Sequence, residues 1–149
     1  YSSIRFQHIK VNGDEFGEVA IDGAIAGDYG VPVIFISADD KCVAEAKEIM
    51  PWIETVETKQ SFAYTRILSK HPKAVVDEIY NGVQNAVKRL DEMKLFTVKS
   101  PLDVEIRYRR PDVATHSRTI DMDGNPFEFV DAYTKVGKLK KIEDIISVL

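Results

Sequence analysis

The stretch that decides the fold spans residues 12–40 and reads NGDEFGEVAIDGAIAGDYGVPVIFISADD. Its first two residues, Asn12-Gly13, both tolerate a positive φ, so they predict a turn after a strand at residues 3–11. Asp14 follows the turn and is placed to cap a helix that runs to about Tyr29. The stretch therefore begins as strand, turn and helix.

The second half of the stretch predicts a buried strand between two helices. Gly30 suits the left-handed residue that ends the first helix. Residues 31–38 are apolar on both faces, as parallel strands are. Asp39-Asp40 then open a second helix, which ends near Met50. This helix–strand–helix order is typical of an α/β fold.

Patterns further along the chain extend this fold. We expect strands at 52–58, 61–68, 102–109 and 118–122, and helices at 72–93, 125–136 and 142–149. The strand at 102–109 alternates apolar and charged residues, which predicts antiparallel pairing and one solvated face. The helix at 125–136 rests on Asn125-Pro126, which resemble a cap followed by proline at the first helical position. The predicted fold is layered helices on a mixed, partly parallel sheet, with residues 1–149 forming a single α/β unit.

Composition excludes several classes of protein. Hydrophobic residues make up 44% and charged residues 30% of the 149, an ordinary globular balance. The net charge of −4 is a poor footprint for nucleic-acid binding. The longest apolar run is too short to span a membrane. Cys42 has no partner for an internal disulfide, so we expect a reducing, cytoplasmic compartment.

Two pairs of carboxylates are candidate site residues. Glu18 and Asp22 lie one helical turn apart, where they could bind a metal or form a solvent-facing polar stripe. Asp39-Asp40 follow a strand at the edge where open α/β sheets bind ligands, but capping and solvation explain them as well.

The remaining chemistry-bearing residues form no recognisable motif. The histidines are His8, His71 and His116. No two of them have the sequence spacing of metal ligands on one helix. Cys42 lies near a helix N-terminus, which lowers a thiol pKa, but no base accompanies it. A basic run at 107–110 reads as a solvated strand end, and the Asp-rich turn at 121–124 lacks calcium-loop spacing.

Several motifs in order resemble the zinc-dependent D-aminopeptidases of the dipeptide-transport-operon type. They are Val11-Asn12-Gly13, Gly17-Glu18, Ala24, Ala26-Gly27, Gly30-Val31-Pro32-Val33, Asp39-Asp40 and Lys59-Gln60. The segment 127–136, with Asp131-Ala132-Tyr133, is similar to the closing helix of that family. No single motif is decisive, but their order and spacing are fairly specific.

The resemblance implies a homo-oligomeric, cytoplasmic metallopeptidase with a two-zinc centre that removes an N-terminal D-residue from short peptides. It implies that Glu18 is a zinc ligand. Asp22 stands where the family often has asparagine, and we expect it to position a ligand rather than bind the metal.

The chain departs from the family in its missing ligands. The family's Asp-x-Glu pair and zinc-binding histidines lie in an N-terminal half, and its catalytic histidine would fall immediately before Tyr1. We therefore expect a C-terminal part with no catalytic residue of its own, completed by N-terminal sequence or a second chain. The hypothesis is a peptidase in which metal-activated water attacks the peptide carbonyl. The alternatives are a non-catalytic oligomeric module, or a small-molecule-binding α/β domain that uses Asp39-Asp40.

Overall fold

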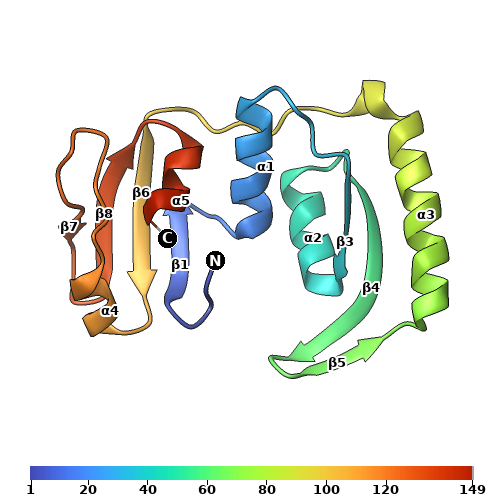
Figure 1. Cartoon of the computed structure of the whole chain (residues 1–149), viewed down its shortest axis with the longest axis horizontal. Helices are drawn as coiled ribbons and strands as arrows, with labels where there is room; N and C mark the ends of the chain where they lie inside the picture. The colour runs from blue at the N-terminus through green and yellow to red at the C-terminus, as the bar shows by residue number, and fades with distance from the viewer. Residues whose placement is uncertain (149) are drawn as a thin grey trace. The chain divides into compact units, whose positions relative to one another are not determined.

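Contacts divide the chain into two compact units within residues 1–148, the part that the computed structural model describes (Figure 1). Unit 1 comprises Tyr1–Ile25 together with the chain from Thr97 on, and unit 2 comprises Ala26–Phe96. One boundary falls inside helix α1 (Glu18–Asp28). The expectation that residues 1–149 act as a single unit stays a prediction.

Unit 1 is built on a five-stranded antiparallel sheet in the order β2-β1-β6-β8-β7. Its strands are β1 (Phe6–Val11), β2 (Asp14–Glu15), β6 (Leu102–Tyr108), β7 (Glu128–Phe129) and β8 (Thr134–Leu139). The central pair β1–β6 joins segments that lie on either side of unit 2 in the sequence. The sheet of unit 1 is therefore assembled from both of its sequence segments.

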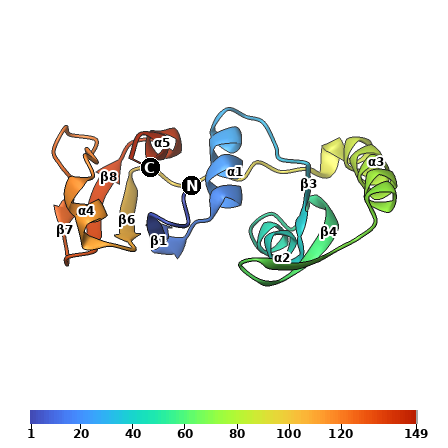
Figure 2. The same ribbon diagram turned by 60° about the horizontal axis from the view of Figure 1, so that its bottom comes forward.

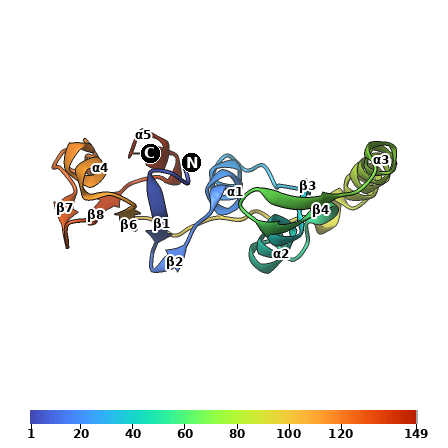
Figure 3. The same ribbon diagram turned by 90° about the horizontal axis from the view of Figure 1, so that it is seen from below.

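One face of this sheet carries the core of unit 1. In β6 the alternate residues Leu102, Val104, Ile106 and Tyr108 are buried, as the alternating pattern predicts. Helices α4 (Pro111–His116) and α5 (Ile145–Val148) lie on the same side of the sheet (Figure 3). With the short 3-10 helix η2 (Ile142–Asp144) they contribute buried side chains, among them Ala114, Ile142 and Ile145.

Unit 2 places two helices on a three-stranded sheet in the order β3-β4-β5. Its elements are β3 (Phe35–Asp39), α2 (Asp40–Ile49), β4 (Glu54–Ala63), β5 (Arg66–Ser69), α3 (Pro72–Lys88) and the 3-10 helix η1 (Leu90–Glu92). The β3–β4 pair is parallel and β4–β5 is antiparallel. Helices α2 and α3 lie on either side of the β3–β4 pair (Figures 1 and 2). The predicted α/β class with mixed, partly parallel pairing is confirmed.

Two turns expected from the sequence are present. Asn12 and Gly13 have φ of 54° and 95° between β1 and β2, and Gly30 has φ of 73° after α1. The helix expected from Asp14 is wrong at its start, because Asp14 and Glu15 pair with β1 as β2. The helix begins only at Glu18.

The segment expected as a strand at 118–122 and a helix at 125–136 folds otherwise. Only an isolated bridge joins Ile120 to Pro126, and β7 and β8 occupy the later segment. The ring of Phe127 lies against Gly137, at a position that a side chain on that residue would occupy. This long-range contact, together with pairing of β8 to β6, outweighs the local capping pattern. The resemblance of 127–136 to a closing helix is therefore wrong.

Other boundaries differ less. The strand expected at 31–38 begins only at Phe35, after a segment that contains Pro32, and its residues are half-buried or exposed. Helix α4 has no counterpart in the expectations. The final helix is confirmed, except that Leu149 lies outside the described residues. No helix among residues 1–148 is long and apolar enough to cross a membrane.

Candidate functional site

The strongest candidate ligand, Glu18, is the first residue of α1 and lies in unit 1. The β1–β2 hairpin brings the chain back so that Phe16 N–H donates to the carbonyl of Ile9 at 2.8 Å and the Phe16 ring is buried. Glu18 follows two residues later and leaves its side chain 69% exposed. An anchored backbone thus presents a carboxylate to its surroundings.

The amino group of Tyr1 contacts this carboxylate through Glu18 Oε1. Two further contacts hold Tyr1 in place. Its hydroxyl donates to the carbonyl of Phe16 at 3.0 Å, and its ring meets the edge of Phe6 at 5.8 Å between centroids. The first residue of the chain and the first turn of α1 are therefore neighbours.

Asp22 lies one turn further along α1 and is also exposed. The buried side of the helix is formed by Ala20, Ile21 and Ala24. Glu18 and Asp22 therefore share the side of α1 that points away from the core, as their spacing predicts.

The histidines do not join Glu18 in a metal site. His8 Nε2 lies 2.8 Å from Glu105 Oε1, and His71 Nδ1 accepts from the Lys73 N–H at 3.2 Å as the cap of α3. His116 Nδ1 lies 2.7 Å from the carbonyl of Asp112. Across residues 1–148, no group of three or more His, Cys, Asp or Glu side chains is arranged to hold a metal ion.

The Asp39-Asp40 pair has a structural explanation. Asp39 caps α2 by accepting from the Cys42 N–H at 3.0 Å, and it also accepts from the Ser61 hydroxyl at 2.6 Å. Asp40 accepts from the Ser61 N–H at 2.8 Å and pairs with Lys41. These hydrogen bonds, Ser61 first, hold the pKa of both carboxyls below the ordinary value. The pair ties α2 to β4.

Cys42 is not activated by its place in α2. Burial, followed by the negative charges of Glu45 and Asp39, raises the pKa of its thiol. The direction is thus opposite to the lowering of the thiol pKa that the sequence predicts for a residue near a helix N-terminus. The thiol is therefore poorly suited to act as a nucleophile.

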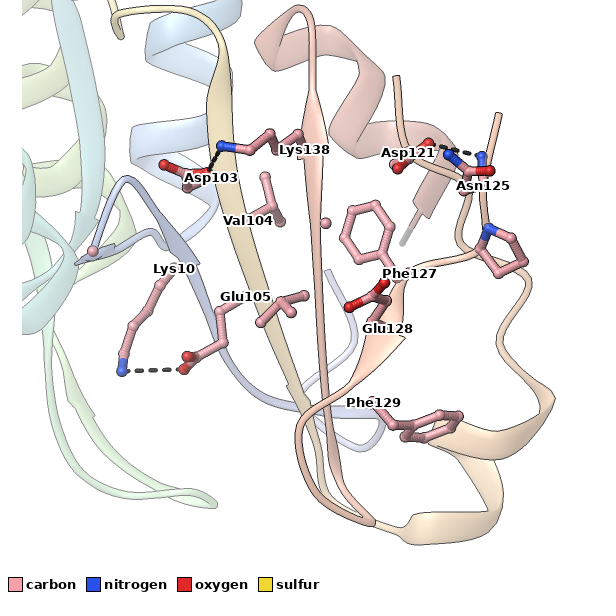
Figure 4. Close-up of a pocket in the computed structure, with 14 residues that line it drawn as sticks. Lys10, Asp103, Val104, Glu105, Asp121, Asn125, Phe127, Glu128, Phe129 and Lys138 are labelled. Carbon is pink, nitrogen blue, oxygen red and sulfur yellow. Dashed lines mark hydrogen bonds and ion pairs between the residues drawn. The ribbon is translucent and has the colours of Figure 1, made fainter. Parts of the chain in front are cut away.

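The polar face of the unit 1 sheet contains a broad hollow of about 1050 Å³ (Figure 4). Two ion pairs line it: Lys10 Nζ lies 3.1 Å from Glu105 Oε1, and Lys138 Nζ lies 2.5 Å from Asp103 Oδ1. Hydrogen bonds from His8 and then Lys10 lower the pKa of Glu105. Both lysines of the lining are thus paired with carboxylates, which makes the hollow a weak candidate for acid–base chemistry.

Lys135 is a buried cation that no sequence pattern singles out. Its ammonium group donates to the carbonyl and hydroxyl oxygens of Ser117 at 2.9 and 3.0 Å, and it lies 4.6 Å from the centroid of the Phe129 ring. Burial lowers its pKa. These contacts fasten β8 to the residue that follows α4, so its role is structural.

Comparison with known proteins identifies the family. The family model described as D-aminopeptidase matches residues 1–148. A D-aminopeptidase of Bacillus subtilis (strain 168) is 26% identical over 91 residues, which cover 61% of this chain and 33% of that protein. This chain therefore belongs to the D-aminopeptidase family.

A solved structure shares the fold. The Zn-dependent D-aminopeptidase DppA from Bacillus subtilis, a self-compartmentalizing protease, superposes with a TM-score of 0.85 at 20% identity. The match covers 97% of this chain and 53% of that one. The chain thus spans about a third of the matched sequence relative and about half of the solved one.

Proposed function

We propose that the chain is the C-terminal part of a zinc-dependent aminopeptidase that removes N-terminal residues, D-residues in particular, from short peptides. Membership of the D-aminopeptidase family supports the reaction class. The description of the solved relative as Zn-dependent and self-compartmentalizing supports zinc and a homo-oligomer for the complete protein. The lone cysteine favours a cytoplasmic location.

The observation that carries the proposal is the position of Glu18. Its carboxylate is exposed at the start of α1 and contacts the Tyr1 amino group. Carboxylate oxygens are regular zinc ligands. In a longer protein, a residue bonded to the Tyr1 nitrogen would lie next to this carboxylate. By the resemblance, the family's catalytic histidine would fall immediately before Tyr1.

Residues 1–148 do not by themselves fit a zinc ion, because they offer no cluster of three ligands. We therefore assign Glu18 as one ligand and Asp22 as a residue that positions it. The other ligands and the catalytic groups come from sequence before Tyr1 or from a second chain. No catalytic residue is assigned within this chain.

The test is made on the complete protein, with peptides that carry an N-terminal D-residue or its L-counterpart. We expect Glu18→Ala to lower both zinc content and kcat/KM for the D-peptide, the latter by at least about 100-fold, because loss of a ligand exceeds the effect of residues behind it. Asp22→Ala should cost about 10-fold. Asp28→Ala is the matched control, since Asp28 is an exposed carboxylate at the other end of α1.

Other outcomes discriminate among the hypotheses. Full zinc content and activity in Glu18→Ala would remove Glu18 from the site. A complete protein that forms a defined oligomer yet binds no zinc and cleaves neither peptide would favour the non-catalytic module. Preference for the L-peptide would retain the aminopeptidase and reject the D-specificity.

A further inference from the structure

The outer face of α3 carries an apolar stripe that the described part of the chain leaves exposed. The stripe consists of Val76 (64% exposed), Tyr80 (64%), Val83 (39%), Val87 (52%) and Leu90 (50%), the last in η1. A different face of α3 packs on the sheet of unit 2. There Gly82 is buried so closely that a Cβ would lie 2.8 Å from the Phe35 ring and 3.0 Å from Val56. The core of unit 2 therefore does not account for the stripe.

The spacing of the stripe is that of a helix–helix contact. Its members follow one another at intervals of four, three, four and three residues, the repeat that keeps a seam facing a second helix. A hollow of about 400 Å³ opens among Val76, Ile79, Tyr80, Val83 and Gln84. Gln84 donates to the Tyr80 hydroxyl at 3.0 Å and holds that ring at the edge of the hollow. A side chain of a facing helix fits such a hollow as a knob.

We propose that α3 packs antiparallel against α3 of a second copy of this chain, about a two-fold axis near Val83. From Val83 the stripe continues at three and seven residues toward the N-terminus and at four and seven residues toward the C-terminus, so it is nearly symmetric about this residue. An antiparallel partner therefore sets Val76 of one copy near Leu90 of the other, and each apolar residue faces an apolar residue. A two-fold contact of this kind uses the same surface on both copies.

Charge at the flank of the stripe favours a second copy in this orientation. Asp77 and Lys88 lie about three helical turns apart and on the same flank. Both are exposed, and neither forms an ion pair within residues 1–148. In an antiparallel pair this flank meets itself, so Asp77 of each copy lies beside Lys88 of the other. Opposite charges thus meet twice across the contact.

The contact is tested in the complete protein by cross-linking at the axis. In a Cys42→Ser background, Val83→Cys should form a disulfide-linked dimer under mild oxidation, because the two copies of this residue meet. Asn85→Cys, exposed on the far side of the same helix, is the control and should stay unlinked. No dimer from Val83→Cys, or equal yields from both positions, would overturn the proposal.

Charge reversal tests the orientation and is independent of the zinc proposal. Asp77→Lys and Lys88→Asp should each weaken association by about 10-fold or more in sedimentation experiments. The double variant Asp77→Lys/Lys88→Asp should restore it, since opposite charges meet again. Failure of the double variant to restore association would reject the antiparallel contact. Zinc content should not change in any of these variants.

Discussion

At the scale of single residues, Ser61 links two elements of unit 2. Its hydroxyl donates to Asp39, the last residue of β3, and its N–H donates to Asp40, the first residue of α2. The hydroxyl lies 2.6 Å from a carboxylate that already caps α2. A hydrogen bond to a charged group is worth more than one between neutral groups. Ser61 therefore contributes to the stability of the β3–α2–β4 segment.

We expect Ser61→Ala to lower the free energy of unfolding by about 1–2 kcal/mol at pH 7, measured by urea denaturation. The pKa of Asp39 lies below its ordinary value of 3.8 in the folded chain, with the Ser61 hydrogen bond as the first cause. The contribution is therefore complete above about pH 4 and is lost as the pH falls through the folded pKa.

The control for this prediction is Ser69→Ala, which removes only an exposed hydrogen bond to the carbonyl of Lys70. It should change the stability by less than about 0.5 kcal/mol. Equal losses from both variants, or a Ser61→Ala loss that persists unchanged below the folded pKa, would contradict the role assigned to Ser61.

Local signals explain which residues the sequence predicts well. Asp39 as a helix cap and Asn12-Gly13 as a turn depend on backbone groups a few residues away, and both are confirmed. The neighbours of Asp40 and Lys135 lie far off in sequence. No short sequence pattern could predict those contacts. The contact between Tyr1 and Glu18 could likewise not be predicted from the sequence.

At the scale of elements, the β7–β8 hairpin contains one close contact that a side chain would block. The Phe127 ring covers Gly137, while Gly137 pairs with Val104 of β6. Only a residue without a side chain leaves room for the ring there. Asp131 adds a local tie by accepting from the Tyr133 N–H at 2.7 Å, within the turn that joins the two strands.

Gly137→Ala should therefore destabilise the protein by about 1–3 kcal/mol, because the added methyl group meets the Phe127 ring. Thermal unfolding followed by circular dichroism measures this. Phe127→Leu in the Gly137→Ala background should recover part of the loss by making room. If Gly137→Ala is neutral, or if the second substitution only adds to the loss, the packing is not as described.

The same contact explains why the sequence misleads at residues 125–136. Asn125-Pro126 satisfies the local rules for starting a helix. Whether a helix forms is decided instead by pairing of β8 with β6 and by burial of Phe127. In contrast, β6 is predicted well, because alternation along one strand records which face is buried. Helix α3 shows its period, but not which apolar face meets the sheet.

At the scale of the whole molecule, the two compact units are joined within a helix. Helix α1 runs from Glu18 to Asp28, and the boundary between the units falls after Ile25. Unit 1 also needs β1 and β6 from either side of unit 2 in the sequence. We propose that residues 1–149 fold as a single unit, as the sequence pattern predicts.

Urea unfolding of the complete protein tests this cooperativity by hydrogen exchange and mass spectrometry. Peptides that cover β4 report on unit 2, and peptides that cover β6 report on unit 1. A single unit predicts coincident loss of protection, because neither part opens without the other. Separate midpoints for the two peptides would show that the units unfold independently.

The candidate site is the part of the molecule that this sequence predicts least completely. Family resemblance points to Glu18, and the structure leaves that carboxylate exposed at the start of α1. Residues 1–148 bring no three ligand-type side chains together, so neither pattern nor geometry of this chain could assemble a complete metal site. The central claim is thus that Glu18 completes a zinc site whose other members come from elsewhere.

The most direct test is the zinc affinity of the complete protein, measured by competition with a chelator for the unaltered protein, Glu18→Gln and Asp28→Asn. Glutamine keeps the size of the side chain and removes its charge. We expect Glu18→Gln to weaken zinc binding by at least about 10-fold and Asp28→Asn to leave it unchanged. Equal affinity in all three proteins would contradict the assignment of Glu18 as a zinc ligand.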